Sequence, residues 1–235
     1  MIAVHHGWSA VASQRGEMMG VRLLLADDHE IVRRGLRALL EAEPGWEIVA
    51  EAGDGRDAIE KTKEMKPDVA ILDISMPSLN GLDAARQIVT SGSPTKVLIL
   101  TVHDSDPLIQ QVLEAGARGY LLKSDAGRDL VAAVDALRRN KTFFTPKVAQ
   151  MVLEGYLGKN PKDGAPDGRG FRLTGRQREI VQLLAEGKSS KEVASALGLS
   201  IKTAETHRAN IMRRLDCHSV TALVRYAIRN HIIDA

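Results

Sequence analysis

The first half of the chain alternates five short apolar runs with five stretches of helical periodicity. The apolar runs are continuous rather than alternating, which is typical of parallel strands covered by helices on both faces. The expected strands are residues 21–26, 47–51, 69–73, 96–102 and 119–122, and the expected helices are residues 31–42, 57–65, 82–90, 108–115 and 129–139. This alternation predicts an α/β fold with a doubly wound, five-stranded parallel sheet.

Charge is divided unevenly along the 235 residues. Residues 20–145 contain 16 Lys and Arg against 20 Asp and Glu, whereas residues 146–235 contain 15 against 9. A basic second half indicates a polyanionic partner such as nucleic acid. The hydrophobic fraction of 44% excludes a wholly disordered chain.

Cysteine usage and hydropathy indicate a cytoplasmic protein. Cys217 is the only cysteine, which excludes an intramolecular disulfide and suits a reducing compartment. No run of 18 apolar residues occurs, so no membrane span is expected. Residues 1–19 lack the apolar core of a signal peptide, and we expect them to form a disordered extension.

Polar residues stand at the carboxyl ends of four expected strands, where ligands bind in sheets of this kind. They are Asp27, Asp28, Asp73, Thr101 and Lys123. Converging carboxylates favour a hard cation such as Mg²⁺, and an aspartate can accept a phosphoryl group covalently. Any one of these acids could simply cap a helix or face water, but five suitable residues at matching positions favour a phosphoryl site.

These residues resemble the receiver domain of two-component response regulators, a flavodoxin-like fold. The resemblance covers residues 21–141 and rests on Asp27-Asp28, the segment Asp73-Ile74-Ser75-Met76-Pro77 with Gly81, Thr101, and Gly119-Tyr120-Leu121-Leu122-Lys123. It implies that Asp73 is the phosphoacceptor. It also implies that Asp28, Asp73 and the Ser75 carbonyl bind Mg²⁺ with help from Asp27. Lys123 would contact the phosphoryl group, while Thr101 and Tyr120 would move in response to it.

A second motif in this half is a weaker indication of function. Residues 53–58 fit the dinucleotide-binding pattern G-x-G-x-x-A between a strand and a helix. The pattern follows the second strand rather than the first, and Asp54 would place a negative charge where a pyrophosphate should lie. We therefore interpret these residues as a tight turn and a helix start.

The second half predicts a linker followed by four helices. Residues 145–158 have amphipathic spacing, and residues 158–170 are rich in glycine and proline, as in a flexible tether. Thr174, Ser190 and Ser200 are the expected N-caps of three helices, and a fourth helix is expected over residues 220–230. The turn at residues 198–200 joins the second and third helices as a helix-turn-helix, whose second helix enters the major groove of DNA.

The third of these helices divides into two faces. Ala204, His207, Ile211 and Leu215 are expected to pack inward, with His207 as a hydrogen-bonded core residue rather than a base reader. The expected DNA contacts, including basic residues that would meet phosphates, are Lys188, Lys191, Lys202, Thr203, Glu205, Thr206, Arg208, Ala209 and Arg213.

Residues 173–230 resemble the LuxR-type output domain. The motifs are Leu173-Thr174-x-Arg176-x-Arg178-Glu179, Ala185-Glu186-Gly187-Lys188-Ser189, Lys191-Glu192-Val193-Ala194 and Lys202-Thr203-Ala204-Glu205-Thr206-His207-Arg208. A receiver coupled to this domain resembles the NarL/FixJ subfamily. The expected divisions are a receiver at 20–142, a linker helix and tether at 143–172, and a DNA-binding domain at 173–235.

Together these features indicate a phosphorylation-controlled transcription regulator rather than an enzyme. The implied partners are a sensor histidine kinase, double-stranded DNA and a second copy of the chain. Two alternatives stay open: a hydrolase that forms an aspartyl phosphate, and a phosphorylation-independent DNA binder with a vestigial receiver.

Overall fold

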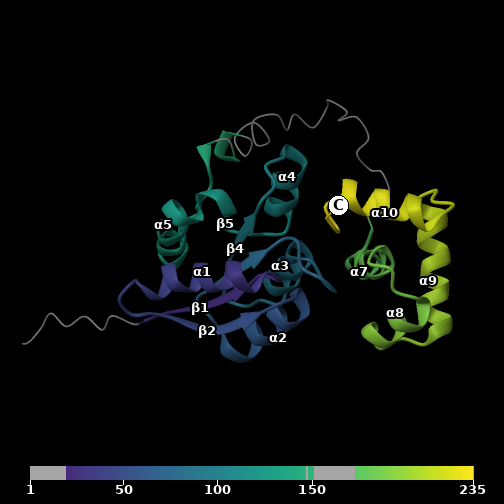
Figure 1. The fold of residues 1–235 in the computed structure, drawn as a ribbon, viewed down its shortest axis with the longest axis horizontal. Coiled ribbons are helices and arrows are strands. Elements are labelled where there is room, and N and C mark those ends of the chain that lie inside the picture. The colour runs from purple at the N-terminus through teal and green to yellow at the C-terminus, as the bar shows by residue number, and fades with distance from the viewer. Residues whose placement is uncertain (1–19, 147, 151–172, 235) are drawn as a thin grey trace, which may run out of the picture.

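The computed structural model describes residues 20–146, 148–150 and 173–234. Residues 20–146 contain the five predicted strand–helix pairs, and residues 173–234 contain the four predicted helices (Figure 1). The predicted N-terminal extension and most of the predicted linker lie outside the described residues. The exact domain boundaries therefore stay predictions. No helix among the described residues is long and apolar enough to cross a membrane.

The five strands form one parallel sheet in the order β2-β1-β3-β4-β5. This arrangement confirms the predicted fold. The strands are β1 (Val21–Ala26), β2 (Trp46–Ala52), β3 (Val69–Asp73), β4 (Lys96–Thr101) and β5 (Gly119–Leu122). Every residue of β3 is buried, because this central strand has neighbours on both sides and helices on both faces.

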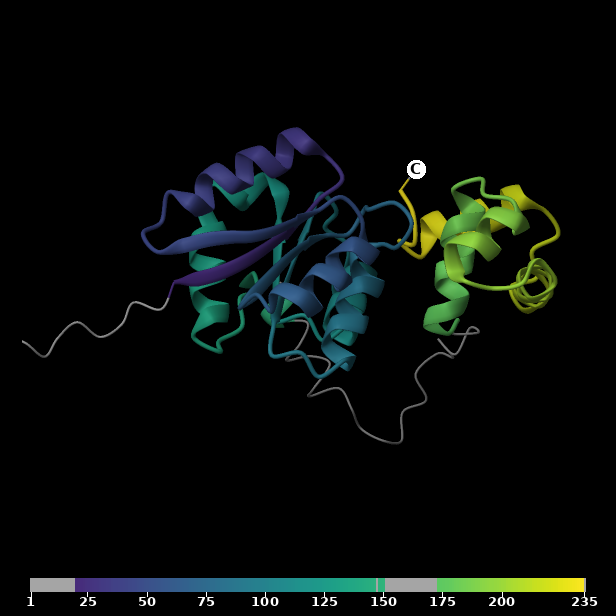
Figure 2. The ribbon, with the colours of Figure 1, turned by 90° about the horizontal axis from the view of Figure 1, so that it is seen from below.

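Helices cover both faces of the sheet (Figures 1 and 2). The helices are α1 (Glu30–Glu41), α2 (Gly55–Met65), α3 (Gly81–Thr90), α4 (Asp106–Glu114) and α5 (Ala126–Arg138). Side chains of α1 and α5 pack in one core cluster, which includes Leu36, Leu40 and Leu130. Side chains of α2, α3 and α4 pack in the cluster on the other face. This layering leaves the carboxyl-terminal edge of the sheet free to hold polar groups.

Several helices begin earlier than the sequence predicts. Helix α2 begins at Gly55 rather than 57, α4 at Asp106 rather than 108, and α5 at Ala126 rather than 129. Their first turns are polar or small, so the apolar periodicity begins only in the second turn. Asp54 accepts hydrogen bonds from the amides of Arg56 and Asp57 as the N-cap of α2, which confirms that the G-x-G-x-x-A pattern is a turn and helix start.

The C-terminal region is a small helical domain with its own core. Its helices are α7 (Gly175–Ala185), α8 (Ser190–Leu197), α9 (Ile201–Arg214) and α10 (Val220–Arg229). Thr174 and Ser200 are N-caps as predicted. The prediction of Ser190 as an N-cap is wrong, because Ser189 accepts from the Glu192 amide and Glu192 bonds back to Ser189 as a capping box.

Candidate phosphoryl site and DNA-reading helix

The polar residues predicted at strand ends meet at one edge of the sheet. Asp27 and Asp28 follow β1, Asp73 ends β3, Thr101 ends β4 and Lys123 follows β5. Because all five strands are parallel, their carboxyl ends point to the same edge. The predicted grouping of these five residues is therefore what the topology produces.

Three carboxylates and one ammonium group form the centre of this site. One side-chain ligand atom from each of Asp27, Asp28, His29 and Asp73 lies within 4.8 Å of all the others. The Lys123 Nζ lies 2.6 Å from Asp27 Oδ2 and 2.9 Å from Asp73 Oδ2. Asp27 and Asp73 are buried, so water screens these charges weakly.

The buried carboxylates carry more negative charge than one lysine neutralises. Burial raises the pKa of Asp73, and Lys123 only partly offsets this effect. Burial by itself would lower the pKa of Lys123, but its contacts with Asp27 and Asp73 raise that pKa above its usual value. The lysine therefore stays protonated, and the site favours an additional cation.

The two buried oxygens that face Lys123 are the atoms best suited to a further ligand. Among the described residues, neither Asp27 Oδ2 nor Asp73 Oδ2 accepts a hydrogen bond of regular geometry, although the ammonium group is close to both. Carboxylate oxygens are the ligands that Mg²⁺ prefers in proteins. The donor set of Asp27, Asp28 and Asp73 therefore fits this ion.

Gly81 allows the loop after Asp73 to fold tightly. Its amide donates to the Ile74 carbonyl at 2.9 Å. A Cβ atom at position 81 would lie 1.9 Å from the Asp73 carbonyl oxygen, which no side chain can tolerate. The glycine thus lets α3 begin directly against the end of β3 and fixes the backbone of residues 74–80 beside the carboxylates.

Thr101 and Tyr120, which we call the switch residues, both bind the backbone of His103. Both side chains are buried. The Thr101 Oγ1 accepts from the His103 amide at 3.1 Å, and the Tyr120 hydroxyl donates to the His103 carbonyl at 2.7 Å. Burial raises the pKa of Tyr120 to about 12, with a smaller contribution from Asp104, so the hydroxyl keeps its proton and remains a donor.

The sequence analysis did not identify His29 as part of this site. Its Nδ1 lies 2.6 Å from Asp28 Oδ1 and 3.4 Å from Asp27 Oδ1. Its amide also donates to Asp27 Oδ1 at 2.8 Å. The position of His29 directly after the acidic pair was the only available signal, because neither periodicity nor charge distinguishes it from a surface histidine.

Helix α9 presents the face that the sequence predicts for DNA. Within it, Ala204 and Ile211 are buried, in agreement with the predicted inner face, whereas His207 is half-buried, and its predicted hydrogen bond stays a prediction. Of the nine predicted DNA contacts, Arg208 is half-buried and the others are exposed: Lys188, Lys191, Lys202, Thr203, Glu205, Thr206, Ala209 and Arg213. The Thr206 hydroxyl donates to the Lys202 carbonyl at 2.8 Å, which leaves its oxygen and methyl group for an outside partner.

Four buried polar residues lie between the two folded regions, and the sequence analysis missed all of them. They are Asn80, Asp83, Glu179 and Gln182. Asn80 and Asp83 lie near the start of α3, and Glu179 and Gln182 lie on α7. Hydrogen bonds connect these residues to the other region, as from the Asn80 amide to Gln182, from Arg178 to Asp83 and from Arg56 to Glu179, and local sequence patterns gave no signal of such contacts.

Two protein families match the chain. The response regulator receiver domain matches residues 23–135, and the luxR family of bacterial regulatory proteins matches residues 172–227. The chain is 38% identical over 214 residues to the transcriptional regulatory protein LiaR of Bacillus subtilis, covering 91% of this chain and 100% of that protein. It is 37% identical over 216 residues to the oxygen regulatory protein NreC of Staphylococcus carnosus, with coverage of 91% and 100%.

The same likeness extends to solved structures. The response regulator RcsB of Salmonella typhimurium is 27% identical, with a TM-score of 0.59 over 91% of this chain and 99% of that one. RcsB bound to promoter DNA has a TM-score of 0.56 at 27% identity, over 88% of this chain and 98% of that one. The chain therefore belongs to the two-component response regulators that join a receiver to a LuxR-type output domain, the NarL/FixJ subfamily, and it is a transcription regulator. The resemblance seen in the sequence is confirmed.

Proposed function

We propose that Asp73 accepts a phosphoryl group from a sensor histidine kinase and thereby controls DNA binding. The observation that supports this most is the buried Asp73 carboxylate, which lies 2.9 Å from Lys123 Nζ and beside two further carboxylates. In this reaction a carboxylate oxygen of Asp73 attacks phosphorus, the nitrogen–phosphorus bond of the phosphohistidine breaks, and the imidazole leaves with that electron pair. Lys123 balances the charge on the transferred group.

Mg²⁺ would be held by Asp28, Asp73 and the Ser75 backbone carbonyl, with Asp27 beside them. When bound, the ion neutralises phosphoryl oxygens and orients them for in-line transfer. Asp27 keeps Lys123 in place through the 2.6 Å contact, and Asp73 supplies the attacking oxygen. Mg²⁺ should therefore raise the melting temperature of the wild-type chain, and Asp28→Ala should remove this effect.

The switch residues would pass phosphorylation on to the surface. The Thr101 hydroxyl would move toward a phosphoryl oxygen, and the Tyr120 ring would change rotamer with it. Phosphorylation shifts the equilibrium between the resting and the active receiver only if it interacts differently with these two states. The new hydrogen bond between the phosphoryl group and the Thr101 hydroxyl provides that difference.

The output domain would then bind DNA as a homodimer, with half-sites about one helical turn apart. RcsB dimers have been seen bound to DNA. We place this function in the cytoplasm, where the kinase domain and the DNA are available.

Acetyl phosphate with Mg²⁺ tests the receiver half of the proposal. Stable incorporation, seen as a rise of about 80 Da in intact mass, is the expected result. Rapid release of phosphate without an accumulated adduct would indicate an aspartyl-phosphate hydrolase. No incorporation would indicate a vestigial receiver. The last two outcomes both contradict the proposal.

Glu205→Ala tests the DNA-reading half. A glutamate near phosphates repels them unless it accepts a hydrogen bond from a cytosine amino group. We expect the variant to select a different consensus from a randomised duplex library, with base discrimination altered by about 1–3 kcal/mol. Lys202→Ala and Arg208→Ala are the matched controls. They should weaken binding to all duplexes alike and reduce the salt slope by about one unit. Selection of the wild-type consensus by Glu205→Ala would show that the residue is not a reader.

A further inference from the structure

The output domain contacts the two loops that follow β3 and β4, the strands that end in Asp73 and Thr101. One loop, residues 74–80, comes directly after Asp73, and the other, residues 102–105, comes directly after Thr101. Helix α7 and the C-terminal end lie toward the receiver, whereas α9 lies on the far side of the output domain (Figures 1 and 2). A single loop therefore separates each strand end from the contact between the domains.

Side chains of α7 and of its C-cap residue, Glu186, form hydrogen bonds with the backbone of the first loop. The Gln182 side chain accepts from the Asn80 amide at 2.8 Å and donates to the Met76 carbonyl at 2.9 Å. The Glu186 carboxylate accepts from the Ser78 amide at 3.0 Å. Three backbone groups of one short loop thus depend on two side chains of the other domain.

The C-terminal tail, defined as residues 230–234, holds the second loop. The His103 Nε2 lies 3.2 Å from Asp234 Oδ1. The His231 Nε2 lies 3.4 Å from Ser105 Oγ, and the rings of His103 and His231 are 6.1 Å apart. The tail contact therefore consists of two histidines, one carboxylate and one hydroxyl, drawn from both domains.

His103 connects this tail contact to the switch residues. Its amide donates a hydrogen bond to the Thr101 hydroxyl, and its carbonyl accepts one from the Tyr120 hydroxyl. Its side chain contacts Asp234. If the Thr101 hydroxyl turns to a phosphoryl oxygen and Tyr120 changes rotamer, the amide loses its acceptor and the carbonyl loses its donor. Both backbone restraints on His103 are then lost together.

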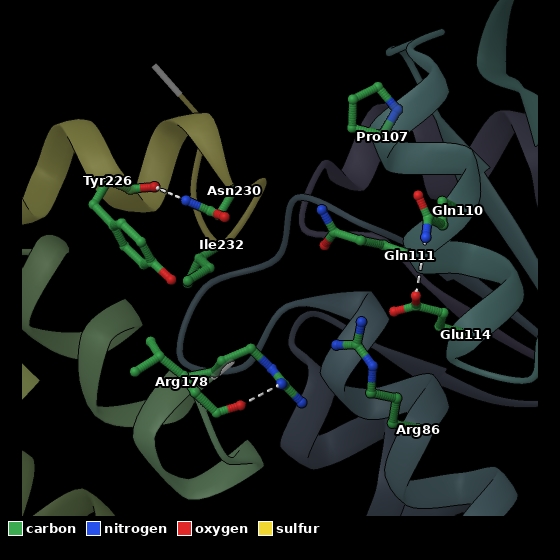
Figure 3. Close-up of a pocket in the computed structure, with 10 residues that line it drawn as sticks. Arg86, Pro107, Gln110, Gln111, Glu114, Arg178, Tyr226, Asn230 and Ile232 are labelled. Carbon is green, nitrogen blue, oxygen red and sulfur yellow. Dashed lines mark hydrogen bonds between the residues drawn. The ribbon is translucent and has the colours of Figure 1, made fainter. Parts of the chain in front are cut away.

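The packing around the tail allows such a release. A cavity of about 580 Å³ lies between α3, α4 and the output domain (Figure 3). Among its lining residues are Arg86, Gln111, Glu114, Arg178, Tyr226 and Ile232. The contact between the domains therefore contains hydrogen-bonded loops and an open space lined in part by polar side chains.

We infer that His103 transmits phosphorylation to the C-terminal tail: its hydrogen-bonding contact with Asp234 holds the output domain against the resting receiver and is released when the switch residues move. This inference rests on the proposed function, because it requires Thr101 and Tyr120 to respond to a phosphoryl group on Asp73. The contact is partly exposed, at 43% for the His103 side chain and 44% for the Asp234 side chain. An exposed pair of this kind biases an equilibrium by a few fold rather than locking it.

Asp234→Ala and His103→Ala test the inference through DNA affinity. The probe is a duplex selected by the wild-type chain, and each protein is titrated with and without acetyl phosphate and Mg²⁺. Each variant should bind about two- to fivefold more tightly than the wild type when unphosphorylated, and equally when phosphorylated. Because both variants break the same contact, the double variant should gain no more than either single one.

Asp216→Ala is the matched control. Asp216 pairs with His218 at 3.1 Å on the output domain, and both side chains are about nine-tenths exposed. Both contacts join a histidine to an aspartate, but the Asp216–His218 pair lies outside the contact with the receiver. Asp216→Ala should therefore bind the duplex with the affinity of the wild type. A gain in resting affinity as large as that of Asp234→Ala would overturn the inference.

A second readout follows the tail itself. Burial and the neighbouring His103 lower the pKa of the His231 imidazole in the resting arrangement. In the wild type, beryllium fluoride with Mg²⁺ should raise this pKa toward its ordinary value, as measured by NMR titration with His231→Gln for assignment. An unchanged His231 pKa in a protein that takes up phosphate and gains DNA affinity would refute the tail mechanism alone. A wild type that takes up no phosphate would refute the proposed function itself.

Discussion

Asp73 and Asp83 are ten residues apart and almost equally buried, yet their surroundings are opposite. The Asp83 carboxylate accepts from Arg86 at 2.9 Å, from Arg178 at 2.6 Å and from the Asn80 side chain at 3.2 Å. The Asp73 carboxylate has Lys123 beside it but also faces two other acids. One aspartate is fully satisfied by donors from both domains, and the other is left available for a reaction partner.

This difference separates a structural carboxylate from a reactive one. Satisfied buried charges hold elements together, because removing one partner leaves the rest uncompensated. A buried carboxylate with a raised pKa and like charges around it costs stability, and such groups are concentrated at functional sites. Burial by itself therefore does not identify a functional acid, whereas the balance of charge around it does.

The largest expected effect is on phosphoryl uptake. Asp73→Asn should abolish the mass increase of about 80 Da with acetyl phosphate, because an amide cannot form the acyl phosphate. Asp28→Ala should also abolish it by removing a magnesium ligand. Asp83→Asn is the matched control, equally buried and in the same region, and it should be phosphorylated. If Asp73→Asn gains the same mass as the wild type, the acceptor is another residue.

The site was predictable from the sequence because it is built from strand ends. Each strand in a parallel sheet delivers its last residue to one edge, so five short apolar runs were sufficient to bring Asp27, Asp28, Asp73, Thr101 and Lys123 together. The five-stranded parallel sheet and the helix-turn-helix were likewise predicted from periodicity and from turn and capping residues, whereas the order of the strands comes from the structure. Sequence reasoning missed His29 at this edge, because its contact with Asp27 and Asp28 depends on the direction of its side chain and not on its position at a strand end.

The contact around Asp83 should respond next most strongly. Asp83→Ala removes the acceptor shared by Arg86 and Arg178 and leaves two guanidinium groups close together. Burial and the neighbouring Arg178 already lower the pKa of Arg86, so this repulsion is not strongly screened. We expect docking of the output domain to weaken by about 1–3 kcal/mol, seen as a larger radius of gyration in small-angle X-ray scattering.

Asp135→Ala is the control for that experiment. Asp135 also pairs with two arginines, Arg138 at 2.7 Å and Arg139 at 3.0 Å, but it lies on α5 away from the output domain. It should leave the radius of gyration unchanged. An equal increase in both variants would mean that Asp83 has no special role in docking.

This contact could not be predicted from the sequence. Four of its residues are polar and lie at the start of α3, as Asn80 and Asp83 do, or on α7, as Glu179 and Gln182 do, where a solvent-exposed position is the ordinary expectation. Their burial depends on residues about one hundred positions apart meeting in space, as Asn80 and Gln182 do. Apolar periodicity indicates which face of a helix packs in its own core, as Ile180, Leu183 and Leu184 of α7 do, and it gives no sign that a polar face is buried against another domain.

A smaller effect should appear in stability. Because the Asp73 pKa is raised in the folded state, the folded chain binds this proton more tightly than the unfolded chain does. The ionised carboxylate therefore destabilises the fold above its ordinary pKa, and the penalty fades as pH falls toward that value. Asp73→Asn should raise the melting temperature at pH 7 by about 2–5 °C and by less near pH 4.5. A lower melting temperature at pH 7 would mean that the contact with Lys123 outweighs the cost of burial.

The smallest expected effect is the pH dependence of docking. Docking lowers the pKa of His231, so the separated form binds this proton more tightly. Docking should be complete above the ordinary histidine pKa and weaken as pH falls through the lowered value. The groups facing the His231 ring are His103, Ser105 and Asp234. Scattering from the unphosphorylated chain between pH 8 and 5.5 should show a gradual increase in radius of gyration, and His231→Gln should remove it. Tighter docking at low pH would instead mean that a protonated His103 bound to Asp234 governs the contact.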